Sequence, residues 1–268
     1  MIARAVLALA LAAAAIAPAH ARDEAVRTIP SRRGVTESFV LVRPASAPVA
    51  SVVLFMGGRG AVGLDRGHIG PRNTNFLIRT RQLFADRGAL VAVLDVPSDR
   101  TSEALVQFRT TSEHAADVRA MIAALRAEAR VPVWLVGTSM GSVSAANAAA
   151  RLQESGPDGI VLTSSVMSRN REMGESLLDV GLDRIRVPVL VVHHRDDGCP
   201  SARHAHTDWV MRQLSAAPKR EMLSFSGGDA PQSGPCDPLA PHGYFGIETK
   251  VVDAIMSWIV ATPPATKP

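Results

Sequence analysis

The sequence predicts an α/β fold in which helices cover both faces of a mostly parallel central sheet. Five short runs rich in Val and Leu are nearly continuous in apolar residues, as expected for strands that are buried on both faces. Between them lie longer stretches whose apolar residues recur every three or four positions, which is typical of helices. Strands that alternate with helices in this way favour a parallel sheet.

The expected elements follow one another at short intervals. Buried strands are expected at residues 51–56, 89–96, 131–136, 159–163 and 187–193, and edge strands, which alternate more loosely, at 36–42 and 220–225. Helices are expected at residues 74–87, 112–130, 139–153, 202–216 and 245–259. The interval between residues 163 and 187 has room for one short helix, at 175–184, so we expect little or no lid.

The composition indicates one globular domain. The chain has 268 residues, of which 47% are hydrophobic and 20% charged, enough for one sizeable core. No repeat, linker or shift in composition marks a second core, so we expect a single domain over residues 22–260. Residues 261–268 read ATPPATKP and are expected to form a disordered tail.

Residues 1–21 have the pattern of a cleaved signal peptide. Arg4 precedes an apolar run at residues 6–17, and the triplet Ala-His-Ala at 19–21 suits a cleavage site. The run is shorter than the ~20 residues that a membrane-spanning helix needs, and no later segment supplies them. We therefore expect an exported protein, periplasmic or secreted, that begins near Arg22 and has no stable membrane insertion.

The charge pattern gives no support for a nucleic-acid partner. The formal net charge is +4, and the basic residues, nearly all Arg, are spread along the chain with only pairs such as Arg32-Arg33 adjacent. An interface with nucleic acid would need these charges gathered on one face or in a run. We expect no nucleic-acid partner.

A serine between a strand and a helix is the candidate nucleophile. The segment G-T-S-M-G at residues 137–141 places Ser139 where the expected strand turns sharply into the expected helix. Such a turn strains the backbone of its middle residue, and only small residues at the positions of Gly137 and Gly141 avoid a collision. A glycine-rich turn without chemistry is the alternative.

A serine nucleophile needs a base and an orienting acid, and two later segments offer them. The strand at 187–193 runs into H-H-R-D-D at residues 193–197, and P-H-G at 241–243 precedes the last helix. With these segments and the G-T-S-M-G turn, the sequence resembles the α/β-hydrolase family over essentially the whole mature chain. The resemblance rests on the strand order, the turn, an acid after the penultimate long strand and a loop histidine before the last helix.

The resemblance implies roles for single residues. In that family the acid commonly sits in an H-G-x-x-D segment, which residues 193–197 match with His194 in place of Gly. This implies Asp197 as the acid, with Asp196 as the alternative one residue away, and His242 as the base. The order serine, acid, histidine is the order expected of this fold.

An oxyanion hole needs two backbone N–H groups. The turn offers the amide of Met140, directly after the nucleophile. The second donor in the family comes from a His-Gly motif after an early strand, where this chain has M-G-G-R-G at residues 56–60. We expect the amide of Gly58 to serve, because glycines let the backbone approach a substrate closely. A flexible loop is the alternative.

The two cysteines, Cys199 and Cys236, are expected to form a disulfide, because an isolated pair in an oxidising compartment is usually bridged. Such a bond would join the loops of Asp197 and His242; two unrelated buried thiols are the alternative. Two cysteines alone cannot supply the four ligands of a structural zinc site.

The histidines near the expected acid raise the alternative of a metal site. His204 and His206, with His193, His194 and the two aspartates, could be read as a cluster of ligands. We expect none, because in a helix over residues 202–214 positions two apart point roughly 200° away from each other.

These observations predict an exported serine hydrolase that cleaves an ester through an acyl-enzyme, with no metal or organic cofactor. Ser139 attacks, His242 acts as base and then as acid, Asp197 orients His242, and the two amides hold the oxyanion. The substrate would be a small molecule or an acyl ester. A serine peptidase or thioesterase on the same scaffold is an alternative, as is a non-catalytic binding protein.

Overall fold

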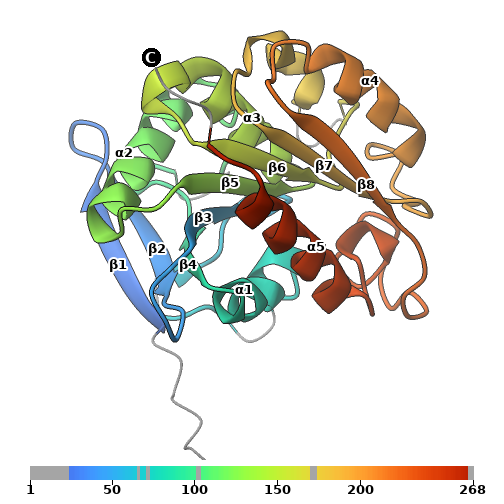
Figure 1. Ribbon diagram of the computed structural model, residues 1–268, viewed down its shortest axis with the longest axis horizontal. Helices are drawn as coiled ribbons and strands as arrows, with labels where there is room; N and C mark the ends of the chain where they lie inside the picture. Colours follow the sequence, from blue (N-terminus) through green and yellow to red (C-terminus); the bar gives the residue numbers. More distant parts are fainter. Residues whose placement is uncertain (1–23, 65–66, 71–72, 101–103, 170–173, 265–268) are drawn as a thin grey trace, which may run out of the picture.

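A computed structural model describes residues 24–64, 67–70, 73–100, 104–169 and 174–264 and shows one eight-stranded sheet between helices (Figure 1). The strands lie in the order β1-β2-β4-β3-β5-β6-β7-β8. Neighbours from β3 to β8 are parallel, whereas β1 and β2 form an antiparallel hairpin and β2 is antiparallel to β4. Their bounds are β1 Glu24–Pro30, β2 Thr36–Val42, β3 Ala50–Phe55, β4 Ala89–Leu94, β5 Val133–Thr138, β6 Gly159–Thr163, β7 Val189–His194 and β8 Arg220–Phe225.

Helices cover the sheet on both faces, which confirms the predicted α/β class. Every residue of β3 to β7 is buried. Alternate side chains of β3 enter different cores: Val53 and Phe55 pack with α2, α3 and α4, and Val52 and Leu54 with α1 and α5. The helices are α1 Phe76–Asp86, α2 Ser112–Glu128, α3 Gly141–Leu152, α4 Thr207–Gln213 and α5 Glu248–Ala261.

Two expected elements differ from the structure. The strand expected at an edge over residues 36–42 is second from the edge, because β1 pairs along its whole length. The expected helix at 175–184 is instead two 3₁₀ turns, Leu177–Asp179 and Leu182–Arg184, separated by Val180 and Gly181. The region described between β6 and β7 thus holds no lid helix.

The ends of two helices also differ. The helix expected at residues 202–216 is a 3₁₀ turn, His204–His206, followed by the short helix α4. The last helix continues to Ala261, and Thr262 is buried and accepts a hydrogen bond from Lys219 at 2.9 Å. The expected tail therefore cannot begin before residue 263.

The expected signal peptide at residues 1–21 and the end of the tail at 265–268 lie outside the described residues. Among the helices that the structure describes, none combines the length and the apolar character needed to span a membrane.

Candidate active site

Ser139 lies at the carboxyl end of β5, on the sharp turn into α3. Its backbone is left-handed, with φ 54°, which is costly for a residue other than glycine. The surroundings fix this conformation: the Ser139 N–H donates to the carbonyl of Thr163 at 2.9 Å, and its carbonyl accepts from the amide and hydroxyl of Ser142. The sequence prediction of a strained strand-helix turn at Ser139 is confirmed.

The glycines of the turn are required by close backbone contacts. A Cβ added to Gly137 would lie 2.2 Å from the carbonyl oxygen of Gly141, and one added to Gly141 would lie 2.0 Å from that of Phe55. A third glycine lies against the serine itself, since a Cβ on Gly57 would lie 2.9 Å from Cβ of Ser139. The loop after β3 therefore runs directly beside the candidate nucleophile.

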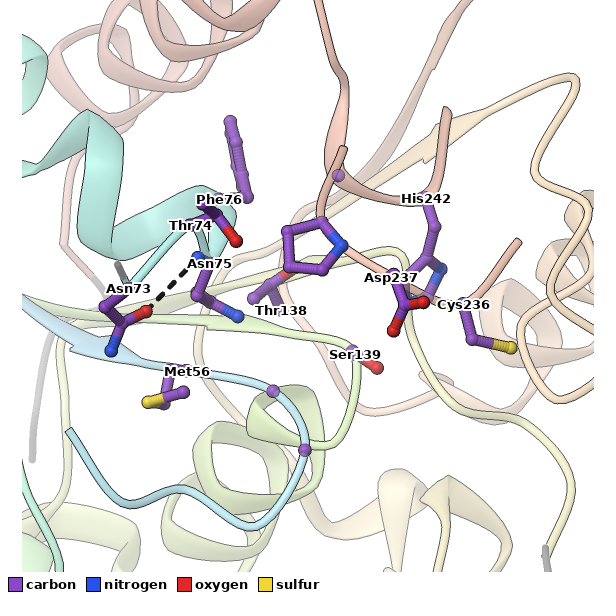
Figure 2. A pocket seen from close by; sticks show the side chains of 14 residues that line it. Met56, Asn73, Thr74, Asn75, Phe76, Thr138, Ser139, Cys236, Asp237 and His242 are labelled. Atoms are coloured by element: carbon purple, nitrogen blue, oxygen red, sulfur yellow. Dashed lines mark hydrogen bonds between the residues drawn. The ribbon is translucent and has the colours of Figure 1, made fainter. Parts of the chain in front are cut away.

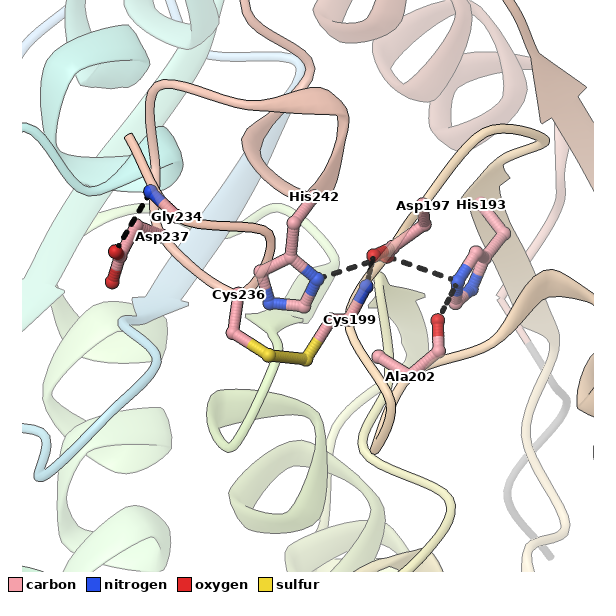
Figure 3. Close-up of a disulfide and its surroundings, with 8 residues drawn as sticks. All are labelled: His193, Asp197, Cys199, Ala202, Gly234, Cys236, Asp237 and His242. Carbon is pink, nitrogen blue, oxygen red and sulfur yellow. Dashed lines mark hydrogen bonds and ion pairs between the residues drawn. A yellow bond between two sulfur atoms is a disulfide. The ribbon is translucent and has the colours of Figure 1, made fainter. Parts of the chain in front are cut away.

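Asp197 and His242 are in contact, although 45 residues separate them (Figure 3). Nδ1 of His242 lies 2.8 Å from Oδ2 of Asp197, and both side chains are buried. Oδ1 of the same carboxylate accepts the backbone N–H of Cys199 at 2.9 Å. The alternative acid, Asp196, has a side chain that is 71% exposed. Of the two aspartates, the structure thus brings Asp197 to the histidine.

His193 is a second histidine on the same carboxylate, and no catalytic role was expected for it. Its Nε2 lies 3.2 Å from Oδ2 of Asp197 and 2.6 Å from the carbonyl oxygen of Ala202 (Figure 3). Because both neighbours are acceptors, Nε2 must carry the hydrogen. Burial alone would raise the pKa of Asp197, but the hydrogen bonds from His193, His242 and Cys199 outweigh it and lower that pKa to about 2.

His194, which stands where the resembling motif has glycine, is a buried neutral histidine. Its Nε2 lies 2.8 Å from the carbonyl oxygen of Gly227, and its Nδ1 accepts the amide of Asp196 at 3.1 Å. Nε2 therefore donates, and the ring joins the loop after β7 to the loop after β8. The departure from the motif thus adds a contact that supports the loop of Asp197.

The histidines after this loop do not gather around a common point. His204 and His206 lie on a 3₁₀ turn, so the helical spacing expected for them is wrong. His204 bonds to the hydroxyl of Ser224, and His206 is exposed. Within the described ranges, no three His, Cys, Asp or Glu side chains come together as a metal site would require.

A pocket of about 390 Å³ opens beside Ser139 (Figure 2). Its walls come from the loop at residues 56–58, the segment 73–76 before and at the start of α1, and the loop at 236–238. Ser139 and His242 both line it. Nε2 of His242 is buried without a hydrogen-bond partner among the described residues, and in the neutral tautomer whose Nδ1–H donates to Asp197, Nε2 is the acceptor nitrogen.

The amides expected to bind an oxyanion lie at this pocket or next to Ser139. Gly58 lines the pocket and has φ 58°, and the carbonyl of Gly57 accepts the amide of Gly60 at 3.3 Å. The N–H of Gly58 belongs to the same peptide unit as that carbonyl, so it points away from this turn. Across the described part of the chain, the amides of Gly58 and Met140 have no backbone acceptor.

The segment that carries His242 is held by a disulfide on one side and by hydrogen bonds of Tyr244 on the other. The structure contains the expected disulfide between Cys199 and Cys236, and Cys236 lines the pocket (Figures 2 and 3). The buried Tyr244 hydroxyl donates to the carbonyl of Val192 at 2.9 Å and accepts the amide of Ser164 at 3.2 Å. These bonds tie the segment that follows His242 to the carboxyl ends of β6 and β7.

The fold is similar to those of several solved structures. An α/β serine hydrolase without a lid from Xanthomonas campestris is 15% identical, with a TM-score of 0.58 over 92% of this chain and 97% of that one. A cold-adapted esterase from an Arctic intertidal metagenomic library is 18% identical, with a TM-score of 0.61 over 89% and 94%. A dienelactone hydrolase from Anabaena variabilis is 16% identical, with a TM-score of 0.60 over 90% and 99%.

No protein-family model matches the chain, and no curated protein matches it in sequence. The similarity thus concerns the arrangement of the elements, which extends over nearly the whole length of both proteins in each pair. The sheet order, the turn at Ser139 and these similarities identify the architecture of the chain as the α/β-hydrolase fold.

Proposed function

We propose that the protein is a serine hydrolase that cleaves esters of small molecules through an acyl-enzyme. One observation carries the proposal: a strained Ser139 shares a pocket with the unpaired, buried Nε2 of His242, whose other nitrogen is bonded to Asp197. A nucleophile, a base and an orienting acid are the three groups that acyl transfer needs. The similar structures, an esterase and a dienelactone hydrolase among them, support the same class of reaction.

In the proposed reaction, Oγ of Ser139 attacks the ester carbonyl carbon while Nε2 of His242 takes the hydroxyl proton. Asp197 keeps the tautomer that leaves Nε2 free and stabilises the imidazolium that forms. The negative charge on the carbonyl oxygen is held by the amides of Met140 and Gly58. His242 then protonates the departing alcohol, and a water deprotonated by His242 attacks the acyl-enzyme to release the acid and restore the serine.

The shape of the pocket favours short, partly polar substrates. A volume of about 390 Å³ holds a small molecule, and its walls include Asn73, Thr74, Asn75 and Asp237 beside the apolar Phe76. A long acyl chain would need a longer apolar surface than these residues supply. We expect short acyl esters to react faster than long ones.

Labelling by a fluorophosphonate tests the activation of the serine. The wild-type protein should be labelled rapidly at Ser139 and should hydrolyse esters, and Ser139→Ala should lose both properties, with a fall in rate of roughly 10⁴-fold or more. A folded Ser139→Ala protein that keeps a tenth of the activity would refute the assignment. A wild-type protein that is neither labelled nor active would favour the non-catalytic binding protein.

Comparison of substrates separates the related reactions. Acyl esters of graded length, thioesters and peptide amides with the same acyl group should be assayed together. Higher kcat/KM for the short ester supports the proposal, and higher kcat/KM for the thioester or the peptide would reassign the enzyme on the same scaffold.

We also propose that the protein is exported after cleavage near Arg22. The pattern of residues 1–21 and the disulfide between Cys199 and Cys236, which suits an oxidising compartment, support this. Sequencing of the N-terminus of protein isolated from the producing cells tests it. An intact N-terminus on cytoplasmic protein would refute the export.

A further inference from the structure

Arg109 is a fully buried cation just before α2, and its side chain contacts the pocket loop. The residue is 1% exposed. Nη1 donates to Oγ of Ser144 at 2.7 Å, and Nη2 donates to the carbonyl oxygens of Gly58 at 3.0 Å and Met56 at 3.3 Å. The guanidinium thus joins α3, the helix that begins behind Ser139, to the loop after β3.

The guanidinium has no carboxylate within ion-pair distance among the described residues. The carboxylate of Glu175 is buried and accepts the backbone amides of Arg109 and Thr110, not the guanidinium. A buried charge without such a partner is costly to keep. Burial lowers the pKa of Arg109 to about 10, so the side chain still carries its charge at neutral pH.

Arg109 and the amide of Gly60 together hold the three carbonyls of the loop at residues 56–58. Nη2 holds the carbonyls of Met56 and Gly58, and the carbonyl between them, that of Gly57, is held by the amide of Gly60. In a trans peptide the N–H points opposite to the carbonyl, so fixing these carbonyls also fixes the directions of the amides of Gly57 and Gly58. Both residues line the pocket, and Gly57 lies against Ser139.

The loop is shaped to admit the guanidinium. Gly60 has φ 86°, and a Cβ at this position would lie 2.7 Å from Nη2 of Arg109. A side chain there would therefore push the guanidinium away from the two carbonyls that it binds. Gly60 is therefore needed so that the backbone can pass close to the buried guanidinium of Arg109.

We propose that Arg109 is a positioning residue for oxyanion stabilisation, which holds the loop at residues 56–58 against Ser139 and keeps a positive charge behind it. This inference rests on the function proposed above. Donors fixed before the reaction stabilise a developing oxyanion without reorganisation, and a charge in a buried, poorly screened position adds to their effect. This stabilisation applies to the transition state and not to the bound substrate, so its loss should lower kcat more than it changes KM.

Two substitutions of Arg109 test the role. Arg109→Lys keeps the charge but has a single ammonium, which cannot reach Ser144 and both carbonyls together, and Arg109→Met removes the charge. We expect kcat to fall by about 10-fold in the first and about 100-fold in the second, with KM within about twofold of wild type. Inhibition by a boronic acid, whose tetrahedral adduct imitates the oxyanion, should weaken by similar factors.

Arg126→Lys is the matched control, because Arg126 also donates to a backbone carbonyl, that of Gly156, far along the chain from the pocket loop. Its kcat should equal that of wild type. Ser144→Ala removes only the hydrogen-bond partner of Nη1, and it replaces Arg109→Met as the test if that variant does not fold. Its kcat should fall by about threefold at unchanged KM.

The inference is overturned if folded Arg109→Lys and Ser144→Ala keep the wild-type kcat and boronate affinity and lose only thermal stability. It is also overturned if KM rises while kcat stays constant. A wild-type protein that lacks esterase activity and fluorophosphonate labelling would instead refute the proposed function, so the two failures are distinguishable.

Discussion

The backbone N–H of Cys199 donates a 2.9 Å hydrogen bond to Oδ1 of Asp197. Cys199 is also joined covalently to Cys236, a residue of the pocket wall that lies six positions before His242. One covalent bond therefore connects a residue that orients the acid with the segment that carries the base. The position of the carboxylate relative to the imidazole depends on this bond as well as on their direct contact.

Removal of the disulfide should affect both stability and catalysis. The double substitution Cys199→Ser, Cys236→Ser should lower the free energy of unfolding by at most about 4 kcal/mol, the chain-entropy value for a loop of this length. It should also lower kcat, because a loosened Asp197 misplaces the base. Thermal unfolding and ester kinetics measure the two effects, and the reduced wild-type protein provides a second comparison. A variant of lower stability with unchanged kcat would limit the bond to a structural role.

The choice between the two aspartates predicts a difference in rate. Asp197→Asn should keep the fold and lower kcat by roughly 10³- to 10⁴-fold, because the amide no longer selects the histidine tautomer. Asp196→Asn is the control, since its side chain is 71% exposed, and its kcat should stay close to wild type. Steady-state kinetics of both purified proteins decide the matter. The opposite order of effects would move the acid one residue upstream.

The low pKa of Asp197 predicts how its contribution to stability depends on pH. Hydrogen bonds lower this pKa from 3.8 to about 2 in the folded protein. A depressed acid pKa stabilises the fold above the unfolded value and loses this effect as pH falls from about 4 to 2. Asp197→Asn should therefore destabilise the protein by roughly 2 kcal/mol more at pH 6 than at pH 2. Equal destabilisation at both values, measured by denaturant unfolding, would contradict the prediction.

The raised pKa of Glu37 predicts the opposite dependence of stability on pH. Its carboxyl is buried in β2 without a hydrogen-bond partner in the described chain, and burial, aided by the charge of Asp117, raises its pKa to about 9. Between pH 4.5 and 9 the unfolded state has released this proton and the folded state has kept it, so stability falls as pH rises. Glu37→Gln should be more stable than wild type at pH 8, by a few kcal/mol, which is the order of magnitude that the raised pKa of Glu37 implies.

The comparison at pH 4 isolates the titration of Glu37. There the side chain is protonated in both states to a large extent, so the gain from Glu37→Gln should nearly vanish. Glu154→Gln, at an exposed position, should show no gain at either pH. Thermal unfolding at the two pH values measures these differences, and a gain of equal size at both would show that ionisation is not its cause.

The elements that periodicity could predict are those buried on both faces. The five central strands appear near their expected positions, because continuous apolar runs such as that of β5 leave few other structures possible. The strand β1 was not expected, since Arg27 and Thr28 interrupt any apolar pattern on an edge that faces solvent. Its pairing with β2 comes from backbone contacts along the hairpin, which side-chain patterns do not reveal.

Among the residues of the candidate site, too, some could be predicted from the sequence and others could not. Ser139 has a local signature, because the glycines at its turn are needed by contacts a few residues away. His193 and Arg109 have none, since their roles depend on partners brought together by the fold, such as Asp197 for one and the loop carbonyls for the other. In sequence, Arg109 resembles any other of the 29 basic residues.

Both ends of the described chain lie near the amino ends of the parallel strands, whereas the pocket lies at their carboxyl ends. Glu24 pairs with Val42, which pairs with Val91 in the first half of β4, and Thr262 bonds to Lys219, just before β8 begins. Ser139, by contrast, follows the last residue of β5. A tether, an affinity tag or a solid support attached close to Glu24 or Thr262 would therefore leave the pocket facing away from the attachment point. The fold is suited to immobilisation by its ends, with the reacting groups directed towards the medium.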